Sequence, residues 1–258
     1  MDQKISKNAN EKNMKWDITT LIMKCMQYHE IYCISYYGVV LKCVFMTIIC
    51  IAVFIIMGIA VSPKFGYQVP SVIAFDESIS SLIYNSGSNL ADDFMILMSM
   101  YGREIVWLAV IVFMSIFAGW RGKKIAIIIV ISFLIIIPLN TLFKNLFERN
   151  RPPVEGLEVH VPDKMDFAYP SGHASIVAAG ASILIILFRR EKELVFSIIL
   201  ACEAALVCIS RIYVGDHYFL DVIGGALLGA GIALLSISLF RYLDPIMTGV
   251  RKYLEKEH

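Results

Sequence analysis

Charged residues are scarce in this chain. They make up 17% of its 258 residues, whereas a soluble domain of this length carries about a quarter. Hydrophobic residues make up 58% and the mean hydropathy is +0.69, so one compact membrane domain is the expected class. The net charge of +1 also lacks the strong positive balance of a nucleic-acid-binding protein, and we expect no nucleic-acid partner.

Two further features are missing. No pair of cysteines has the CxxC spacing, and the six cysteines lie in or beside apolar stretches, as small buried apolar residues do. They indicate neither a disulfide framework nor a metal site, and we expect neither a metal nor a cofactor. The N-terminus, MDQKISKNANEKNMKWD, is polar and has no short apolar core, which is the pattern of a chain without a cleavable signal peptide.

Long apolar stretches are present instead. A membrane-spanning helix needs about 20 mostly apolar residues, and shorter ones are tolerated inside a bundle. Six stretches meet this description, so the sequence predicts an all-α membrane protein with a six-transmembrane-helix bundle. They run from about Val39 to Val61, Ile105 to Trp120, Ile125 to Phe143, Ser171 to Phe188, Leu194 to Ile209 and Phe219 to Phe240.

Residues 62–104 mix apolar and polar side chains. Within them, FDESISSLIYNS predicts a short helix lying in the membrane interface. ADDFMILMSMYG is either a second helix of this kind or an extension of the span that follows it.

Basic residues indicate the orientation of the spans. Lysine and arginine are concentrated before the first predicted span, in the RGKK and RREKE connections, and after the last span. These segments alternate onto one face, so we expect a multi-pass cell-membrane protein with both termini in the cytoplasm. The corresponding division is an N-terminal cytoplasmic or interfacial tail over residues 1–38, a six-span domain over 39–240, and a C-terminal cytoplasmic tail over 241–258.

Three polar motifs lie on the opposite, non-cytoplasmic face, at the outer ends of the third to sixth predicted helices. They are KNLFERNRPP, YPSGH and SRIYVGDHYFLD. Basic clusters that set topology belong on the cytoplasmic face, so the cations of the first motif need another explanation. The candidate site residues of the three motifs are Lys144, Arg151, Ser171, Gly172, His173, Arg211, His217 and Asp221.

Together these residues can form a phosphoryl-transfer site. Arginine offers planar bidentate donors to phosphate and lysine offers a point charge, while a helix that begins at Ser171 adds free backbone N–H groups. If the last helix begins before His217, Asp221 shares a face with it and can accept a hydrogen bond from one imidazole nitrogen, leaving the other directed at a substrate. His173 is a second imidazole that can protonate a leaving oxygen.

The spacing of the first motif carries a further prediction. Lys144 and Arg151 are about two helical turns apart, so on a continuing helix they share a face. Pro152 and Pro153 then end that helix. Arg149 would point away from this face, and we expect it to be a solvated neighbour.

In this order, Lys-x6-Arg-Pro, Pro-Ser-Gly-His and Ser-Arg-x5-His-x3-Asp resemble the signature of the type 2 phosphatidic acid phosphatases, from roughly Phe75 to Phe240. These are the integral-membrane lipid phosphate phosphatases, related to vanadium haloperoxidases and glucose-6-phosphatase. The resemblance implies a six-span bundle, an active site at the non-cytoplasmic ends of helices 3 to 6, and hydrolysis without a metal. It implies that His217 is the nucleophile of a phosphohistidine, that Asp221 orients it, and that His173 protonates the leaving group. The phosphate-binding residues that it implies are Lys144, Arg151, Ser171, Gly172 and Arg211.

The expected function is therefore hydrolysis of a lipid phosphate, with phosphatidate, phosphatidylglycerophosphate and polyprenyl (di)phosphate as candidates. Two alternatives stay open. The segment Tyr218-Phe219-Leu220 departs from the Tyr-Pro-Thr often found in the family and resembles some lipid phosphotransferases, which pass the phosphoryl group to an alcohol other than water. The other alternative is a non-catalytic binder or transporter of phosphorylated lipids, against which the intact His217, Asp221 and Arg211 argue.

Overall fold

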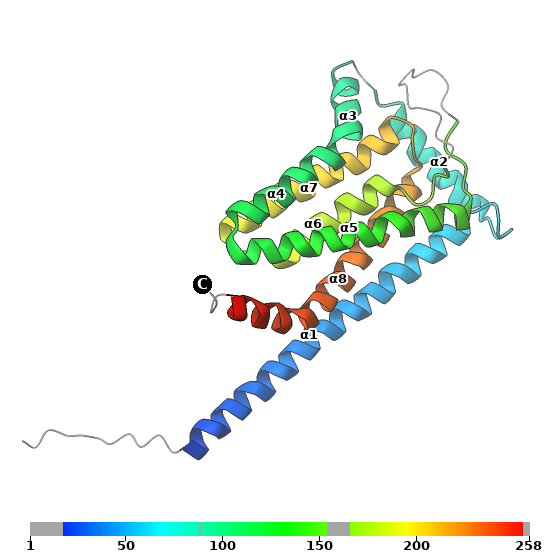
Figure 1. Cartoon of the computed structure of the whole chain (residues 1–258). Coiled ribbons are helices and arrows are strands. Elements are labelled where there is room, and N and C mark those ends of the chain that lie inside the picture. The colour runs from blue at the N-terminus through cyan, green and yellow to red at the C-terminus, as the bar shows by residue number, and fades with distance from the viewer. Residues whose placement is uncertain (1–17, 88, 154–165, 255–258) are drawn as a thin grey trace, which may run out of the picture. The chain divides into compact units, whose positions relative to one another are not determined.

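The computed structural model describes residues 18–87, 89–153 and 166–254, and within these ranges all regular structure is helical, which confirms the predicted all-α class. By contacts the chain divides into Met1–Lys42 and Cys43–His258, and the candidate site lies wholly in the second unit. The helices (Figure 1) are α1 (Ile18–Val61), α2 (Pro70–Tyr84), α3 (Asn89–Tyr101), the π-helical turn η1 (Gly102–Val106), α4 (Trp107–Phe117), α5 (Gly119–Phe147), α6 (Gly172–Leu187), α7 (Glu191–Tyr213) and α8 (Phe219–Leu254).

Five of the described segments are long and apolar enough to cross a membrane. The remaining predicted span, the fourth, corresponds to α6, which is apolar but shorter. Large apolar side chains such as Leu108, Leu134 and Ile199 are exposed on the outer faces of these helices, as lipid-facing positions allow. The five segments are Val40–Val61, Ala91–Phe117, Gly119–Phe147, Glu191–Tyr213 and Phe219–Arg241.

The second span is longer than its apolar core suggests. It begins at Ala91 and includes α3, η1 and α4, so the stretch ADDFMILMSMYG extends the span and is not a separate interfacial helix. Gly102 opens the π-helical turn in the middle, and a Cβ atom there would lie 2.5 Å from Val207 Cγ2 of α7. The glycine therefore lets α3 and η1 approach α7 closely.

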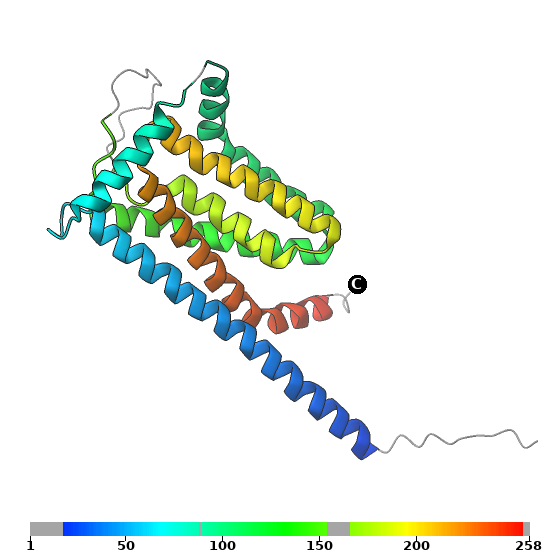
Figure 2. The same cartoon turned by 180° about the vertical axis from the view of Figure 1, so that it is seen from behind.

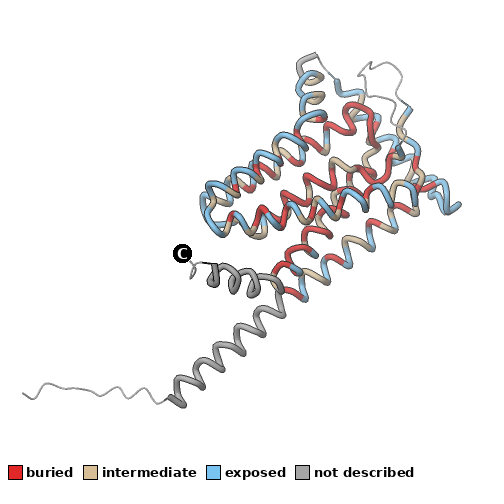
Figure 3. The backbone as a smooth tube through the Cα atoms, viewed as in Figure 1, coloured by how far each residue is buried: buried red, intermediate tan, exposed pale blue. Residues whose placement is uncertain are grey.

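Most residues of helix α6 are buried, and the helix contacts α5, α7 and α8. Buried residues are concentrated on it and on the facing side of α8 (Figure 3). A Cβ atom at Gly225 or Gly229 of α8 would lie 2.4 Å from Ser171 O or 2.1 Å from Ser175 O, so these helices touch backbone to backbone. The lipid is as apolar as the core, so this close packing is what holds such helices together.

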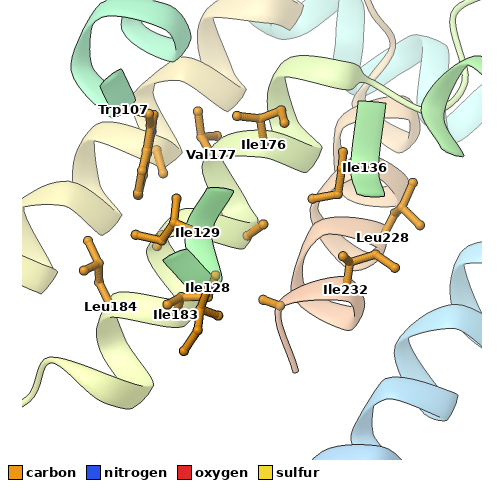
Figure 4. Packing of buried hydrophobic residues seen from close by; sticks show 14 of the residues in the cluster. Trp107, Ile128, Ile129, Ile136, Ile176, Val177, Ile183, Leu184, Leu228 and Ile232 are labelled. Carbon is orange, nitrogen blue, oxygen red and sulfur yellow. The ribbon is translucent and has the colours of Figure 1, made fainter. Parts of the chain in front are cut away.

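Further along, the same core is filled by larger side chains. Trp107 of α4 packs over Gly180 of α6, and branched side chains of α5, α6 and α8 interdigitate beside it (Figure 4). This packing fixes α6 rigidly, and α6 carries the second motif at its N-terminal end. The residues of the second motif are thus attached to a well-packed helix.

Candidate active site

The three motifs meet at one end of the bundle. Lys144 lies near the C-terminal end of α5, Ser171 and Gly172 start α6, and Arg211 lies near the C-terminal end of α7. His217 lies in the turn between α7 and α8. The same end is crossed by α2, which contacts α7 and α8 (Figures 1 and 2).

The turn that carries His217 is closed by backbone hydrogen bonds. The N–H groups of Asp216 and His217 both donate to Arg211 O at 3.1 Å. Gly215 has φ of +75°, a conformation that L side chains rarely adopt, so this glycine makes the turn possible. The Arg211 guanidinium pairs with the Asp216 carboxylate across the turn, which ties the end of α7 to the residue beside His217.

His217 is 2% exposed and lies between a cation and a carboxylate. Its Nε2 is 3.4 Å from Arg151 Nη1, and its Nδ1 is 3.7 Å from Asp221 Oδ2. The second distance is too long for a hydrogen bond, and Nδ1 has no other partner. Because α8 begins at Phe219, His217 precedes the helix, and the shared helical face expected for His217 and Asp221 is not formed.

Burial lowers the pKa of His217 well below its usual value, and the neighbouring cations Arg151, Arg211 and Lys144 lower it further, while Asp216 opposes them. Protonation of a buried imidazole among cations is unfavourable, because burial and the like charges both disfavour its charged form. The neutral form, with a lone pair available on one nitrogen, therefore dominates at neutral pH. This is the protonation state that a nucleophile needs.

The two cations of the first motif converge on one carboxylate. Lys144 Nζ pairs with Asp166 Oδ2, and Arg151 Nη2 binds Asp166 Oδ1 at 2.5 Å. Arg151 also donates to Asp216 O at 2.8 Å. Burial alone would raise the pKa of Asp166, but its hydrogen bonds with Lys144 and Arg151 outweigh burial and lower that pKa to about 2. Lys144 and Arg151 can therefore hold one anion between them. No sequence pattern had indicated Asp166 as their partner.

The helix that carries Lys144 ends earlier than the sequence suggested. Phe147 is its last residue, and Glu148 takes a left-handed conformation with φ of 50°. The Phe147 carbonyl accepts a hydrogen bond from Ser62 Oγ at 2.5 Å instead of continuing the helical ladder. Lys144 and Arg151 thus do not share a helical face, and the prediction that the prolines end the helix was wrong. The two side chains meet through a bend in the chain.

That bend also turns Arg149 inward. The prediction that Arg149 is a solvated neighbour was wrong, because its side chain is only 5% exposed. Its Nη1 binds Asp221 Oδ1 at 2.6 Å and its Nη2 binds Asp76 Oδ2 at 2.5 Å. Burial on its own lowers the pKa of Arg149, but Asp221 and Asp76 outweigh burial and raise it, so this guanidinium is a permanent charge inside the protein.

The start of α6 is open toward the site. Ser171 is the N-cap residue, and its N–H donates to Asp221 O at 2.9 Å. The Ser171 hydroxyl is buried and makes no hydrogen bond, and nothing lies within 4 Å of the position of a Cβ atom on Gly172. His173 follows on the first helical turn and is half-buried. The first N–H groups of a helix have no intrahelical acceptor, so the open space beside Gly172 suits an anion.

Arg211 is the most enclosed of the three predicted phosphate-binding cations. Its Nη1 donates to Ser99 O at 3.2 Å and also binds the Ser99 hydroxyl, while Nη2 binds Asp216. Its Nε is buried and makes no hydrogen bond. Arg211 therefore holds Ser99 of α3 and Asp216 together beside His217, and one of its N–H groups remains for an anion.

A cavity of about 570 Å³ lies beside His217. Helix α2 and its C-terminal cap form one wall, and the prolines after Arg151 form another. A cavity of this size, with both apolar and polar lining, suits part of an organic ligand. Its lining residues are Glu77, Ser80, Ser81, Tyr84, Asn85, Pro152, Pro153, Ile212, Gly215, His217 and Tyr218. Among the described residues, no group of three or more His, Cys, Asp or Glu side chains is placed to hold a metal ion.

Comparisons with known proteins point in one direction. A family model described as the PAP2 superfamily matches residues 124–245. The chain is 39% identical over 197 residues to a protein named undecaprenyl-diphosphatase from Sulfolobus acidocaldarius, with 74% of this chain and 89% of that protein covered. It is 30% identical over 122 residues to sphingosine-1-phosphate phosphatase 2 of Homo sapiens, with 45% and 30% covered.

A solved structure has the same fold. It is the crystal structure of a transmembrane PAP2-type phosphatidylglycerolphosphate phosphatase from Bacillus subtilis, which aligns with a TM-score of 0.62 at 24% identity. The alignment covers 77% of this chain and 98% of that one.

Proposed function

This chain belongs to the PAP2 superfamily and is a membrane lipid phosphate phosphatase, and we propose that it works through a covalent phosphohistidine at His217. One observation carries the proposal. Buried His217 directs Nε2 to within 3.4 Å of Arg151, and Arg151 and Lys144 hold a carboxylate between them. A neutral imidazole therefore lies beside a two-cation anion site, as in-line attack on a phosphate requires.

In the first step, the terminal phosphate of the lipid displaces the Asp166 carboxylate from Lys144 and Arg151. His217 Nε2 attacks phosphorus, a P–N bond forms, and the P–O bond to the lipid breaks. His173 gives its proton to the leaving oxygen. The N-terminus of α6 and the two cations stabilise the charge on the transferring group.

In the second step, water attacks the phosphohistidine. His173, now neutral, takes a proton from the water, and the P–N bond breaks to release inorganic phosphate and neutral His217. Acid and base roles alternate on one imidazole between the two steps. In this scheme Lys144, Arg151 and Arg211 provide the positive charge that a divalent metal provides in other phosphatases.

We further propose that the site faces the non-cytoplasmic side, with both termini in the cytoplasm. The charge bias of the connections supports this orientation. The relatives suggest three substrate types for this chain: a polyprenyl diphosphate, phosphatidylglycerophosphate and a long-chain base phosphate such as sphingosine 1-phosphate. Phosphatidate is a fourth candidate, on the sequence motifs.

The direct test is a panel assay. Purified protein in detergent micelles is given each of these four lipids, and release of inorganic phosphate is measured alongside transfer of labelled phosphate to added alcohols. Phosphate release on at least one lipid is the expected result. Label that appears only on an alcohol would identify a phosphotransferase, and binding of every lipid without turnover would indicate a non-catalytic binder.

Chelation and vanadate provide a second test. We expect activity to survive an excess of chelator, because cations of the protein and a helix start hold the phosphate. We also expect micromolar vanadate to inhibit the enzyme. At a phosphate site vanadate forms a trigonal-bipyramidal adduct with an imidazole nitrogen. Activity that chelation abolishes and magnesium restores would contradict this prediction.

The pH dependence of kcat/KM tests the protonation state of His217. Burial and the cations Arg151, Arg211 and Lys144 lower the pKa of His217 below 6.5, against the opposing charge of Asp216. The attacking imidazole must be neutral, so activity is lost only when the pH falls below this lowered pKa. The ionisation of the substrate's phosphate also contributes to the pH profile, and it is measured by ³¹P NMR and corrected for. The remaining acid limb should lie below pH 6.5. An acid limb above pH 6.5 would mean that the nucleophile is not in this environment.

A further inference from the structure

Helix α2 lies outside the three motifs and outside the region that the family model matches. It nevertheless crosses the end of the bundle where His217 lies, in contact with α7 and α8 (Figures 1 and 2). Two of its side chains, Asp76 and Ser80, are buried. A buried carboxylate needs partners to compensate for its lost hydration, so the partners of Asp76 indicate what this helix does.

The first partner of Asp76 and Ser80 is the start of α8. Phe219 N donates to Ser80 Oγ at 2.9 Å, and Leu220 N donates to Asp76 Oδ1 at 2.8 Å. The first N–H groups of a helix have no intrahelical acceptor and are usually capped by a neighbouring side chain in the sequence. Here the caps come from a different helix, which fixes the position of the residues that follow His217.

The second partner of Asp76 is Arg149. The guanidinium spans Asp76 and Asp221, with one Nη on each carboxylate at 2.5 and 2.6 Å. Arg149 also lies over the Tyr218 ring, 4.2 Å from its centroid. Both carboxylates are 0% exposed. The group carries two negative charges and one positive charge, and the N–H groups at the start of α8 compensate for the remaining negative charge.

Asp221 connects this group to the candidate nucleophile. Its Oδ1 is held by Arg149, and its Oδ2 accepts from Tyr218 N at 2.9 Å and faces His217 Nδ1 at 3.7 Å. The plane of the Asp221 carboxylate is therefore set by Arg149, and Arg149 is held in turn by Asp76. A short movement of Asp221 brings Oδ2 within hydrogen-bond distance of His217 Nδ1.

We propose that Asp76 and Arg149 are positioning residues of the reaction, which through Asp221 orient the His217 imidazole for attack. This inference rests on the proposed function. It makes α2 a part of the catalytic machinery, because one helix both lines the cavity beside His217 and holds the carboxylate that orients the imidazole. Asp76 and Arg149 do not touch the substrate, so they should affect the rate of the chemical step more than the binding of phosphate.

The test is Asp76→Asn. The amide of asparagine can still accept the hydrogen bond from Leu220 N. It presents either N–H groups or a neutral oxygen to Arg149, so the ion pair with Arg149 is lost. Arg149 and Asp221 then lose their fixed geometry. We expect kcat to fall about 10- to 100-fold, the range found when the hydrogen-bond partners behind metal-bound histidines are removed. The affinity for inorganic phosphate should change less than about threefold, because Lys144 and Arg151 are untouched. Loss of one negative charge should also move the acid limb of kcat/KM to lower pH.

The charges around His217 make that shift interpretable. They are Lys144 of α5, Arg151 of the segment after it, Arg211 of α7, Asp216 of the turn, and Asp221 of α8. None of these is altered in Asp76→Asn. A role of Asp76 in folding alone would change the amount or the thermal stability of the protein, but not the pH at which the remaining activity is lost.

Glu193→Gln is the matched control. Glu193 is also a carboxylate paired with an arginine, Arg121, at 2.9 Å. It lies in the first turn of α7, at the other end of that helix from Arg211. It should cost stability without changing kcat or the acid limb. Arg149→Lys is the second variant: it keeps the charge but cannot bridge two carboxylates, so it should lower kcat and couple non-additively with Asp76→Asn.

Assaying His217→Ala in parallel separates the two levels of inference. If His217→Ala retains activity, the proposed nucleophile is wrong. If His217→Ala is inactive while Asp76→Asn and Arg149→Lys keep wild-type kcat and an unshifted acid limb, the positioning role is overturned and the proposed function stands. Should Asp76→Asn not fold, the kcat and acid limb of Arg149→Lys decide the question.

Discussion

His217→Ala is expected to abolish phosphate release. In the proposed mechanism His173 acts as acid and base and not as the nucleophile, and removal of a covalent nucleophile costs on the order of 10⁵-fold or more in kcat when no other group takes its place. The substitution removes a buried side chain but leaves Lys144 and Arg151 in place. Phosphate release from the preferred lipid of the panel, measured with a detection limit near one ten-thousandth of the wild-type rate, checks this.

Two controls accompany this variant. Binding of inorganic phosphate, measured without vanadate, should persist because the cations remain. The thermal unfolding transition should remain cooperative. Asp221→Asn should be less severe, since the imidazole is still present but poorly oriented. If His217→Ala kept more than about one hundredth of the activity, the nucleophile would have to be assigned elsewhere.

Arg151→Ala should have the second largest effect. Arg151 lies beside the imidazole, with Nη1 3.4 Å from His217 Nε2, and it also binds the Asp166 carboxylate. Loss of a donor aimed at transition-state charge costs roughly 3 kcal/mol, about a hundredfold. We expect kcat/KM to fall by at least this factor, and Lys144→Ala should lower it by a similar amount for the same reason.

Arg189→Ala is the matched control for these variants. Arg189 is exposed in the connection between α6 and α7, at the end of α6 opposite to Ser171, and exposed charges contribute little. Arg151→Lys should recover only part of the loss, because lysine cannot bind phosphate through two parallel donors. Equal losses in Arg151→Ala and Arg189→Ala would mean that the basic residues only attract anionic lipid through their summed charge.

The sequence predicted the structure where apolar composition alone determines a helix. Stretches of apolar residues predicted the helices that are long enough to cross a membrane, because the bilayer imposes length and composition on each segment separately. The three motifs were brought to one end of the bundle because each lies at the end of such a helix. The two cations of the first motif meet at one carboxylate, Asp166, and their role in binding phosphate stays a prediction.

The path by which those cations meet was not predictable. A continuing helix from Lys144 to Arg151 is locally reasonable, but Ser62, far away in the chain, takes the Phe147 carbonyl and the helix ends there. The burial of Arg149 follows from the same bend. A side chain two residues from a helix end can point either way, and only its tertiary partners Asp76 and Asp221 decide the direction.

Asp76 could not be identified from sequence for a related reason. In FDESISSLIYNS an acidic residue on a short amphipathic helix is usually solvated, and nothing local distinguishes it from Glu77, which is exposed. The distinction arises because α2 packs across the start of α8 with one face, so that adjacent acidic residues have opposite fates. Asp166 was missed because an aspartate between two motifs carries no spacing signal.

Trapping the covalent intermediate tests the central claim most directly. Enzyme is mixed with a ³²P-labelled lipid phosphate, quenched within milliseconds in alkali and digested, and the labelled peptide is sequenced by mass spectrometry. A phosphohistidine survives alkali but is hydrolysed in acid. We predict base-stable, acid-labile label on His217, formed at least as fast as turnover and absent from His217→Ala. Phosphate release at the full rate with no label on His217 at any time point would contradict the account.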